Sequence, residues 1–164
     1  MSMRIKSNYL LYNGIKYKCS IGNGGFRDKK KEGDGCTPIG VFQVTDILYR
    51  EDKIKNLVAN YSLQTISPSD GWCDDPNSKH YNTKIKFPFA DSAEELFRTD
   101  DRYDIVCVTN HNQNPIISGA GSAIFIHIAS EDYSATAGCI ALSLKDLTEI
   151  LSTLTKTTEL FFGL

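Results

Sequence analysis

Ser122-Ala-Ile-Phe-Ile-His-Ile-Ala129 is the stretch on which the fold of this chain depends, because it is the clearest candidate for a buried strand. Successive side chains of a strand point to opposite faces, so the three isoleucines share one face. The other face carries Phe125, His127 and Ala129. A face of three isoleucines predicts burial against a core, and the single histidine then lies on the opposite face, where it can point into a cleft.

A cysteine follows ten residues after this strand, in Thr136-Ala-Gly-Cys-Ile-Ala-Leu142. The polar segment 130–136 is long enough to turn the chain and to bring the side chains of His127 and Cys139 together. A cysteine becomes an effective nucleophile when a nearby base takes its proton. We therefore interpret Cys139 as a candidate nucleophile for acyl transfer and His127 as its base.

Two features favour catalysis over a purely structural role. Gly138 allows a sharp backbone turn, so that N–H groups near the cysteine can converge on a developing oxyanion. A backbone carbonyl can orient an imidazole as well as a carboxylate does. Against this, a histidine between isoleucines is commonly a satisfied core residue, and a cysteine among small apolar residues can simply pack. The spacing alone leaves both interpretations open.

Length and composition are those of one soluble globular domain, which we expect to span residues 1–164. Hydrophobic residues make up 41% and charged residues 23% of the chain, and the net charge of −2 argues against a nucleic-acid partner. No apolar run approaches the roughly 20 residues of a membrane span. The first residues contain no apolar segment typical of a signal peptide.

The cysteines and the other candidate ligands indicate neither a disulfide framework nor a metal site. There are five cysteines, an odd number, and none forms a C-x-x-C pair. The polar segment from Trp72 to Asn82 contains cysteine, histidine and aspartate, but without any recurring zinc spacing. We expect no metal and no cofactor, and we interpret this segment as a packed loop that lines a site.

Short strands dominate the remaining pattern. The first 21 residues read as a hairpin around Asn13-Gly14, whose residues tolerate the positive φ angles of a tight turn. A glycine-rich segment at 22–35 is interpreted as a mobile surface loop, since it lacks the features of a phosphate-binding loop. Further strands are expected at 37–45, 61–66 and 104–109.

Two helices are expected. Ser92 and Glu95 form a capping-box pattern that predicts a short helix over 92–98. Ser143 is a good N-cap for a last helix with Asp146 at its third position. The apolar stripe of this helix comprises Leu144, Leu147, Ile150, Leu151 and Leu154. His111 lies in a turn and is expected to be solvated.

The stretches around His127 and Cys139 resemble the signature of the YkuD-type L,D-transpeptidases, in which a histidine is followed after a gap by Ser/Thr-His-Gly-Cys. Thr37-Pro-Ile-Gly-Val-Phe is similar to the family's Thr-Pro-x-Gly-x-Phe strand. The similarity covers roughly residues 15 to 152 and is greatest to a compact single-domain bacterial subgroup. Its other matching stretches are Asp70-Gly-Trp-Cys-Asp-Asp-Pro with Tyr81-Asn82, Leu96-Phe-Arg-Thr-Asp-Asp-Arg-Tyr-Asp104, and Gly121-Ser-Ala-Ile-Phe-Ile-His127.

This resemblance implies a mainly β domain, like a β-sandwich or barrel, with a few short helices that include a C-terminal one. It implies attack by the thiolate on a peptidoglycan stem tetrapeptide, at the bond between its third residue and D-Ala. An acyl-enzyme thioester is then passed to an amine or to water. The residues concerned would be Cys139 as nucleophile, His127 as base and Ile128 as orienting carbonyl. The N–H groups of Gly138 and Cys139 would contribute to the oxyanion site, together with Thr136. The substrate contacts would be Trp72, Tyr81 and Ser122.

Two positions depart from the family pattern. The second histidine of the signature is replaced by Ala137, and the Arg or Asn that many members have two residues after the cysteine is replaced by Ala141. Two alternatives to transpeptidation therefore stay open, namely a carboxypeptidase or amidase on the same fold and a non-catalytic peptidoglycan-binding module. The resemblance places the protein in the cell envelope, whereas an unprocessed N-terminus would place it in the cytoplasm.

Overall fold

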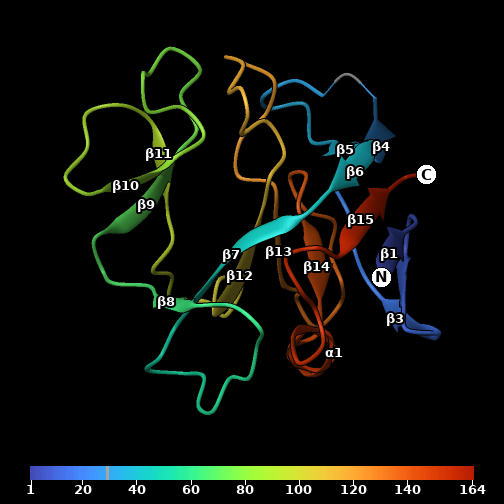
Figure 1. The fold of residues 1–164 in the computed structure, drawn as a ribbon. Helices are drawn as coiled ribbons and strands as arrows, with labels where there is room; N and C mark the ends of the chain where they lie inside the picture. Colours follow the sequence, from blue (N-terminus) through green and yellow to red (C-terminus); the bar gives the residue numbers. More distant parts are fainter. Residues whose placement is uncertain (29) are drawn as a thin grey trace.

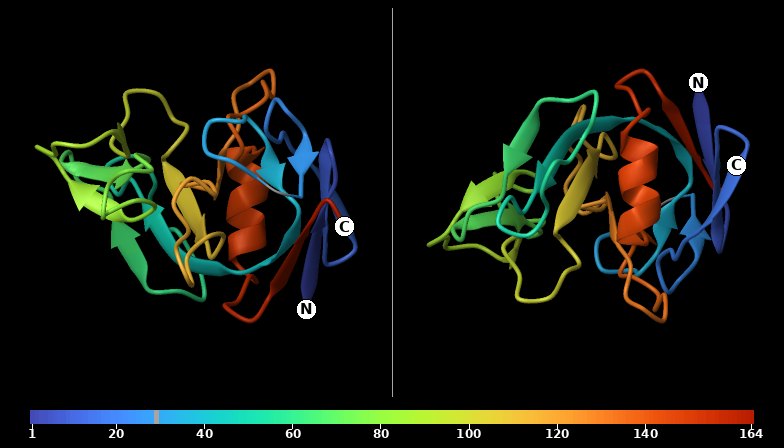
Figure 2. Two further views of the ribbon diagram at one scale, coloured as in Figure 1. Left: turned by 90° about the horizontal axis from the view of Figure 1, so that it is seen from above. Right: turned by 90° about the horizontal axis from the view of Figure 1, so that it is seen from below.

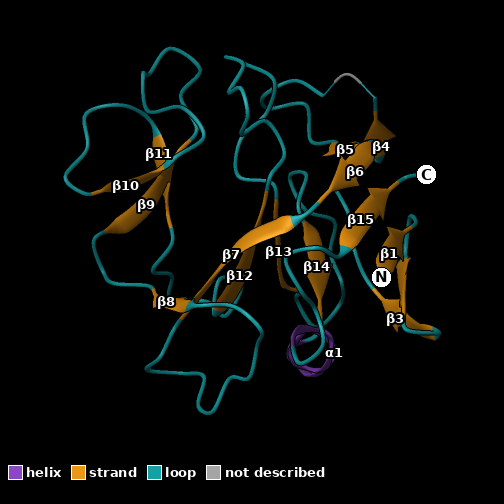
Figure 3. Ribbon diagram, viewed as in Figure 1, coloured by secondary structure: helices purple, strands orange, loops and turns teal. Residues whose placement is uncertain are grey.

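The computed structural model describes residues 1–28 and 30–164, and within them the chain forms fifteen short strands and one helix (Figures 1 and 3). Lys29, inside the predicted glycine-rich loop, lies outside the described residues. The mainly β fold expected from the sequence is confirmed. The sheets remain open rather than closing into a barrel. No helix in the described part of the chain has the length and hydrophobicity that crossing a bilayer requires.

The first five-stranded sheet joins the two ends of the chain. Its order is β3-β2-β1-β15-β6. The strands are β3 (Ile15–Lys18), β2 (Tyr9–Tyr12), β1 (Ser2–Ile5), β15 (Glu159–Phe162) and β6 (Gly40–Phe42). The predicted hairpin is confirmed as β2 and β3, and its turn residues Asn13 and Gly14 have φ angles of 50° and 76°. Strand β1 runs parallel to β15, so the N- and C-terminal segments lie side by side (Figure 1).

The second five-stranded sheet contains the strand that carries His127. Its order is β14-β13-β12-β7-β8. The strands are β14 (Ile140–Leu142), β13 (Phe125–Ile128), β12 (Ile105–Thr109), β7 (Val44–Tyr49) and β8 (Leu63–Thr65). The expected strands at 104–109 and 61–66 are therefore confirmed as β12 and β8. The expected strand at 37–45 is divided, since β5 (Thr37–Pro38) pairs with β4 (Phe26–Arg27), and β6 joins the first sheet.

Apolar residues cover both faces of this second sheet. Ile126 and Ile128 belong to the larger core, which includes the first sheet and helix α1 (Leu144–Leu151). Phe125 belongs to a second core with Trp72 and Tyr103. The predicted division of the two faces of β13 is thus confirmed. Helix α1 lies between the sheet that holds β1 and β15 and the sheet that holds β12 and β13 (Figure 2).

The helix α1 matches its prediction except at one position. The Ser143 hydroxyl accepts a hydrogen bond from the Asp146 N–H, as expected for an N-cap. Leu147, Ile150 and Leu151 are buried. Leu144, however, is 43% exposed, because its side chain, in the first turn, packs into neither core. The apolar stripe therefore begins one turn later than predicted.

The helix predicted over 92–98 is wrong. Residues Ala93–Glu95 form strand β11, which pairs with β9 (Asp70–Cys73) in a three-stranded sheet completed by β10 (Lys84–Lys86). The Ser92 hydroxyl donates to a carboxylate oxygen of Asp74 at 2.7 Å rather than capping a helix. A seven-residue helix has little stability of its own, so pairing with β9 decides the conformation.

Candidate active site

His127 and Cys139 lie on neighbouring parallel strands and line the same hollow, whose volume is about 320 Å³. His127 is in β13, and Cys139 directly precedes β14. The register pairs Ile126 with Ile140 and His127 with Ala141, which brings the cysteine level with the strand segment before the histidine. The polar segment between the strands turns the chain as expected, and Asp132 holds that turn by accepting hydrogen bonds from Ser130 and Ser134.

The imidazole of His127 is buried in one defined tautomer. Its Nδ1 lies 3.0 Å from the Ile128 carbonyl oxygen, which can only accept a hydrogen bond. Nδ1 therefore carries the proton, and Nε2 has a free lone pair. The Tyr103 ring packs edge-on against the imidazole, with ring centroids 5.4 Å apart. Burial lowers the pKa of His127 to about 4, so that the imidazole is neutral at pH 7.

The thiol of Cys139 is held by the backbone of the strand segment beside it. Its sulfur donates to the Ala123 carbonyl oxygen at 3.1 Å and accepts from the Phe125 N–H at 3.4 Å. Burial, reinforced by the negative charge of Glu94, raises the pKa of Cys139 to about 12. The resting pair is thus a neutral thiol and a neutral imidazole, and a thiolate would form only if a base took the thiol proton.

Thr136 and Gly138 shape the turn before the cysteine. The Thr136 hydroxyl donates to the Cys139 carbonyl oxygen at 2.6 Å and accepts from the Gly138 N–H at 3.0 Å. The Gly138 N–H, which was expected to stabilise an oxyanion, is therefore occupied in this state. The Cys139 N–H, directly before strand β14, is the other backbone donor beside the thiol.

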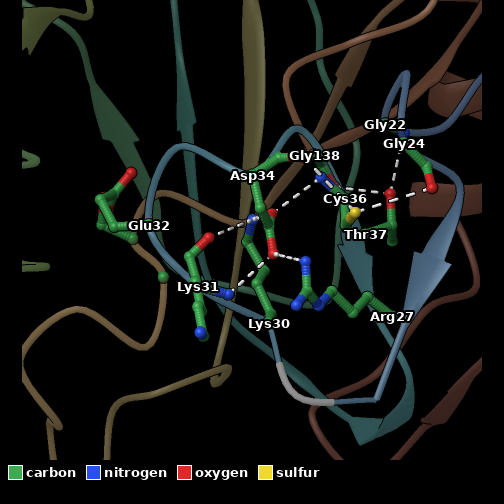
Figure 4. A network of polar contacts seen from close by, with 12 residues as sticks. Gly22, Gly24, Arg27, Lys30, Lys31, Glu32, Asp34, Cys36, Thr37 and Gly138 are labelled. Carbon is green, nitrogen blue, oxygen red and sulfur yellow. Dashed lines mark hydrogen bonds and ion pairs between the residues drawn. The ribbon is translucent and has the colours of Figure 1, made fainter.

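Gly138 itself cannot be replaced without strain. Its φ angle is 145°, and a Cβ atom there would lie 2.8 Å from the Cys36 carbonyl oxygen and 3.4 Å from the Lys30 Nζ atom. The Thr37 hydroxyl also donates to the Gly138 carbonyl oxygen at 2.8 Å (Figure 4). The glycine before the cysteine is required by these close contacts as well as by its backbone angle.

The glycine-rich segment 22–35, predicted as a mobile surface loop, has several exposed residues but also carries one buried charged side chain. The Lys30 side chain is only 4% exposed and binds the Asp34 carboxylate at 2.8 Å (Figure 4). Burial disfavours the charged form of Asp34, but hydrogen bonds from Lys30 and from the N–H groups of Lys31 and Cys36 outweigh it and lower its pKa to about 2. The segment packs against Gly138 and forms one wall of the hollow.

The charged lining of the hollow is the part that sequence reasoning missed. Lys30, Glu32, Asp74, Glu94 and Arg102 all line it, and they come from well-separated parts of the chain. No short motif connects them. At Glu94 the incorrect helix prediction also concealed that the residue lies on a strand, where its side chain and that of Glu95 point to opposite faces.

The three expected substrate contacts occupy different places. Ser122 lines the hollow and donates to a carboxylate oxygen of Glu32. Tyr81 donates to the same Glu32 oxygen at 2.7 Å and lies behind the wall. Trp72 is 6% exposed and packs on Phe125, so that it supports β13 from behind. From the segment between Trp72 and Asn82, only Asp74 reaches the hollow.

A second hollow, of about 230 Å³, meets the first at His127. Arg102, Thr136 and Ala137 also line both. The imidazole can therefore be approached from two sides. Among the described residues, no group of three or more His, Cys, Asp or Glu side chains is gathered as ligands of a metal ion.

His111, expected to be solvated, is instead partly buried. Its ring packs edge-on against Phe42 at 5.5 Å, and its Nδ1 atom is buried without a hydrogen-bond partner among the described residues. Burial, followed by the nearby charge of Lys30, lowers the pKa of His111 to about 4. The prediction is wrong because the segment after β12 folds back over β6.

A model of the family described as the L,D-transpeptidase catalytic domain (YkuD) matches residues 6–161 of the chain. No curated protein and no solved structure gives a match. The matched range contains the whole second five-stranded sheet and every residue of the two hollows, whereas β1 and the last residue of β15 lie outside it.

Proposed function

Because this chain belongs to the L,D-transpeptidase catalytic-domain family, we propose that it is a cysteine acyltransferase of peptidoglycan metabolism. In this proposal it cleaves the bond between the third residue of a tetrapeptide stem, diaminopimelate in many bacteria, and D-Ala. The acyl group then passes to an amine. The observation that carries the proposal is the neutral, oriented imidazole of His127 in the same hollow as the Cys139 thiol.

In the first step the Nε2 atom of His127 accepts the thiol proton of Cys139. For this the thiol rotates away from the Ala123 carbonyl, to which it donates in the resting state. The sulfur attacks the carbonyl carbon, and the oxyanion is stabilised by the Cys139 N–H. When the tetrahedral intermediate collapses, the carbon–nitrogen bond breaks, and the departing D-Ala amine takes the proton from His127. A thioester on Cys139 remains.

In the second step an acceptor amine attacks the thioester, and the thiolate leaves and regains its proton through His127. Two hollows that meet at the imidazole suit a reaction that brings two chains to one carbon. If water is the acceptor, the same thioester yields a trimmed tripeptide, and the protein is then a carboxypeptidase. Because peptidoglycan lies outside the cytoplasmic membrane, we expect the protein to act at the cell envelope, which fractionation of the native protein tests.

The test is incubation of the purified protein with a disaccharide-tetrapeptide, followed by mass spectrometry of the products and of the intact protein. We expect release of D-Ala, a covalent adduct on Cys139, and a cross-linked dimer. Cys139→Ala is expected to abolish all three. Cys19→Ala, which removes a thiol buried in the core, serves as the control and is expected to keep the activity. An unchanged D-Ala release by Cys139→Ala refutes the proposal.

The products also separate the alternatives. Trimmed tripeptide without dimer favours the carboxypeptidase, because hydrolysis and cross-linking give products of different mass. Tight binding of the stem with no adduct and no released D-Ala favours a non-catalytic peptidoglycan-binding module.

A further inference from the structure

Glu94 is a charged side chain in the hollow to which the mechanism above assigns no role. It lies in the middle of strand β11, opposite Trp72 of β9, so its backbone is fixed by pairing. It lines the same hollow as His127 and Cys139, whereas its neighbour Glu95 is exposed. A carboxylate on a rigid strand beside a buried thiol is costly, because burial disfavours its charge. A carboxylate kept in the hollow at this energetic cost is a candidate functional group.

Tyr103 fixes the carboxylate of Glu94 relative to the imidazole. Its hydroxyl donates to one carboxylate oxygen of Glu94 at 2.9 Å, and its ring packs edge-on against His127. One tyrosine thus contacts both groups. The carboxylate is close enough to Cys139 for its charge to raise the pKa of the thiol. Glu94, His127 and Cys139 therefore line one hollow, which an acceptor must enter to reach the thioester.

The chemistry of acyl transfer to an amine needs a second base. An amine acceptor is an ammonium ion at neutral pH, and it loses two protons on becoming an amide nitrogen. His127 relays one of them to the departing sulfur. The other must leave before attack, because an ammonium has no lone pair. A carboxylate in the hollow can accept it.

We propose that Glu94 is the catalytic base that accepts the first proton of the acceptor's ammonium group. This inference rests on the proposed acyl transfer. The ammonium N–H bond breaks and its proton moves to the Glu94 carboxylate. The freed lone pair forms the bond to the thioester carbon, the second proton moves to His127 Nε2, and the carbon–sulfur bond breaks. The thiolate regains that second proton from His127, and Glu94 releases its own to solvent.

The charges around Glu94 suit this role. Burial, reinforced by the charge of Asp74, raises its pKa to about 7, although the Tyr103 hydrogen bond and the charges of Arg98 and Arg102 oppose this shift. Lys30 and Arg102 also face the thiol from the lining. A carboxyl group with a pKa near 7 is about half ionised at neutral pH. It can therefore both accept a proton and return it to water.

The experiment separates acylation from transfer. The wild-type protein, Glu94→Gln and the control Glu95→Gln are acylated with a disaccharide-tetrapeptide, and the acylation rate is followed by intact mass. D-Methionine or hydroxylamine is then supplied as acceptor. Hydroxylamine is mostly uncharged at neutral pH, so it needs no base before attack. For Glu94→Gln we expect transfer to D-methionine to fall about 10²-fold relative to transfer to hydroxylamine by the same acylated variant. The ratio of the two transfer rates does not depend on how the lost charge changes acylation.

The outcomes distinguish this inference from the proposed function. If the wild type forms no adduct, the acyl transfer itself fails. If Glu94→Gln slows transfer to both acceptors equally, or slows transfer to neither of them, Glu94 is not the base. The proposed acyl transfer is not affected by that result. Glu95→Gln is expected to match the wild type throughout.

A pH profile of the wild type gives the same decision without any variant. If Glu94 is the base, transfer to D-methionine rises up to about pH 7 and then levels off, since the carboxylate is fully ionised while the acceptor is still an ammonium. If only free amine attacks, the rate continues to rise by about tenfold per pH unit above pH 7, and the inference is overturned.

Discussion

The Nδ1 atom of His127 lies 3.0 Å from the carbonyl oxygen of Ile128, the next residue along strand β13. The strand therefore orients its own histidine, without a carboxylate partner. Because the carbonyl can only accept, the proton is on Nδ1, and Nε2 is left to act as a base. Burial then lowers the pKa of the ring, so that this base is unprotonated over the neutral range.

The lowered pKa of His127 predicts an unusual acid limit for acylation. An ordinary histidine, with a pKa of about 6.5, is about nine-tenths protonated at pH 5.5 and then a poor base. His127, with a pKa of about 4, stays neutral there and loses its basic form only as the pH falls through about 4. We expect single-turnover acylation of Cys139, measured by intact mass without an acceptor, to change less than about twofold between pH 7 and 5.5.

A fall of acylation centred near pH 6.5 contradicts this prediction.

The lowered pKa of His127 also has a consequence for stability, because the unfolded histidine binds a proton at a higher pH than the folded one. His127 is therefore expected to lower the free energy of unfolding as the pH falls from about 6.5 toward 4, and His111 contributes in the same direction. The raised pKa of Glu94 opposes them but offsets only one of the two histidines, so a net decrease is expected. Urea unfolding at pH 7 and pH 5 measures this decrease in the free energy of unfolding.

Asn82 is expected to be the most sensitive polar residue outside the hollow. Its carbonyl oxygen accepts from the Trp72 indole and from the Ala123 N–H, both at 3.0 Å. Its amide donates to two loop carbonyls, those of His111 and Asn112. Asn82→Ala leaves several buried groups unpaired, and we expect a loss of about 3 kcal/mol in the free energy of unfolding, measured in urea.

The matched control is Asn77→Ala, which truncates an exposed asparagine of the same segment and is expected to change stability by less than about 0.5 kcal/mol. The Ala123 carbonyl accepts the hydrogen bond of the Cys139 thiol, and Asn82 holds the Ala123 N–H, so Asn82→Ala is also expected to slow acylation. Equal stabilities of the two variants refute the prediction.

Helix α1 offers a test of the corrected apolar stripe. Leu147 is 1% exposed, whereas Leu144 is 43% exposed. Leu147→Ala creates a cavity between the two sheets and is expected to lower the free energy of unfolding by about 3 kcal/mol. Leu144→Ala removes a side chain that water already reaches, and a change below about 0.5 kcal/mol is expected. Similar losses for both, measured by chemical denaturation, contradict the assigned burial.

What could be predicted from the sequence was encoded locally. The two faces of β13, the Asn13-Gly14 turn and the Ser143 cap each depend on residues within a few positions of one another, and all three are confirmed. The position of Cys139 beside the histidine strand followed from the length of one loop. These features were readable because their physical causes lie within one segment.

What could not be predicted depends on contacts between distant segments. The capping pattern at Ser92 and Glu95 is a real helix signal, but the open edge of β9 pairs with this segment and turns it into a strand. Lys30 lies against Gly138 because Asp34 and Thr37 hold the loop there. Glu94 and Tyr103 are brought together with Cys139 only by the complete fold. No local sequence pattern indicates that these three residues line the same hollow.

Gly138 gives a prediction that separates two effects of adding one methyl group. At φ 145° any Cβ atom strains the backbone, and here it also meets the Cys36 carbonyl oxygen at 2.8 Å. Gly119 has a φ angle of 78° but nothing within 4 Å of a Cβ atom, so Gly119→Ala introduces backbone strain without a clash. We expect both variants to lose about 1 to 2 kcal/mol in unfolding free energy from the backbone strain alone.

The clash should add a specific defect to Gly138→Ala. To relieve it, the turn must move away from Cys36, and the N–H and thiol of Cys139 move with it. We expect acylation of Gly138→Ala to be at least about 10²-fold slower, since small misplacements of reacting groups have effects of that size, whereas Gly119→Ala acylates at the wild-type rate. The measurement is intact mass against time at a temperature where both variants are folded. Comparable acylation by the two variants would mean that the position of this turn does not control the thiol.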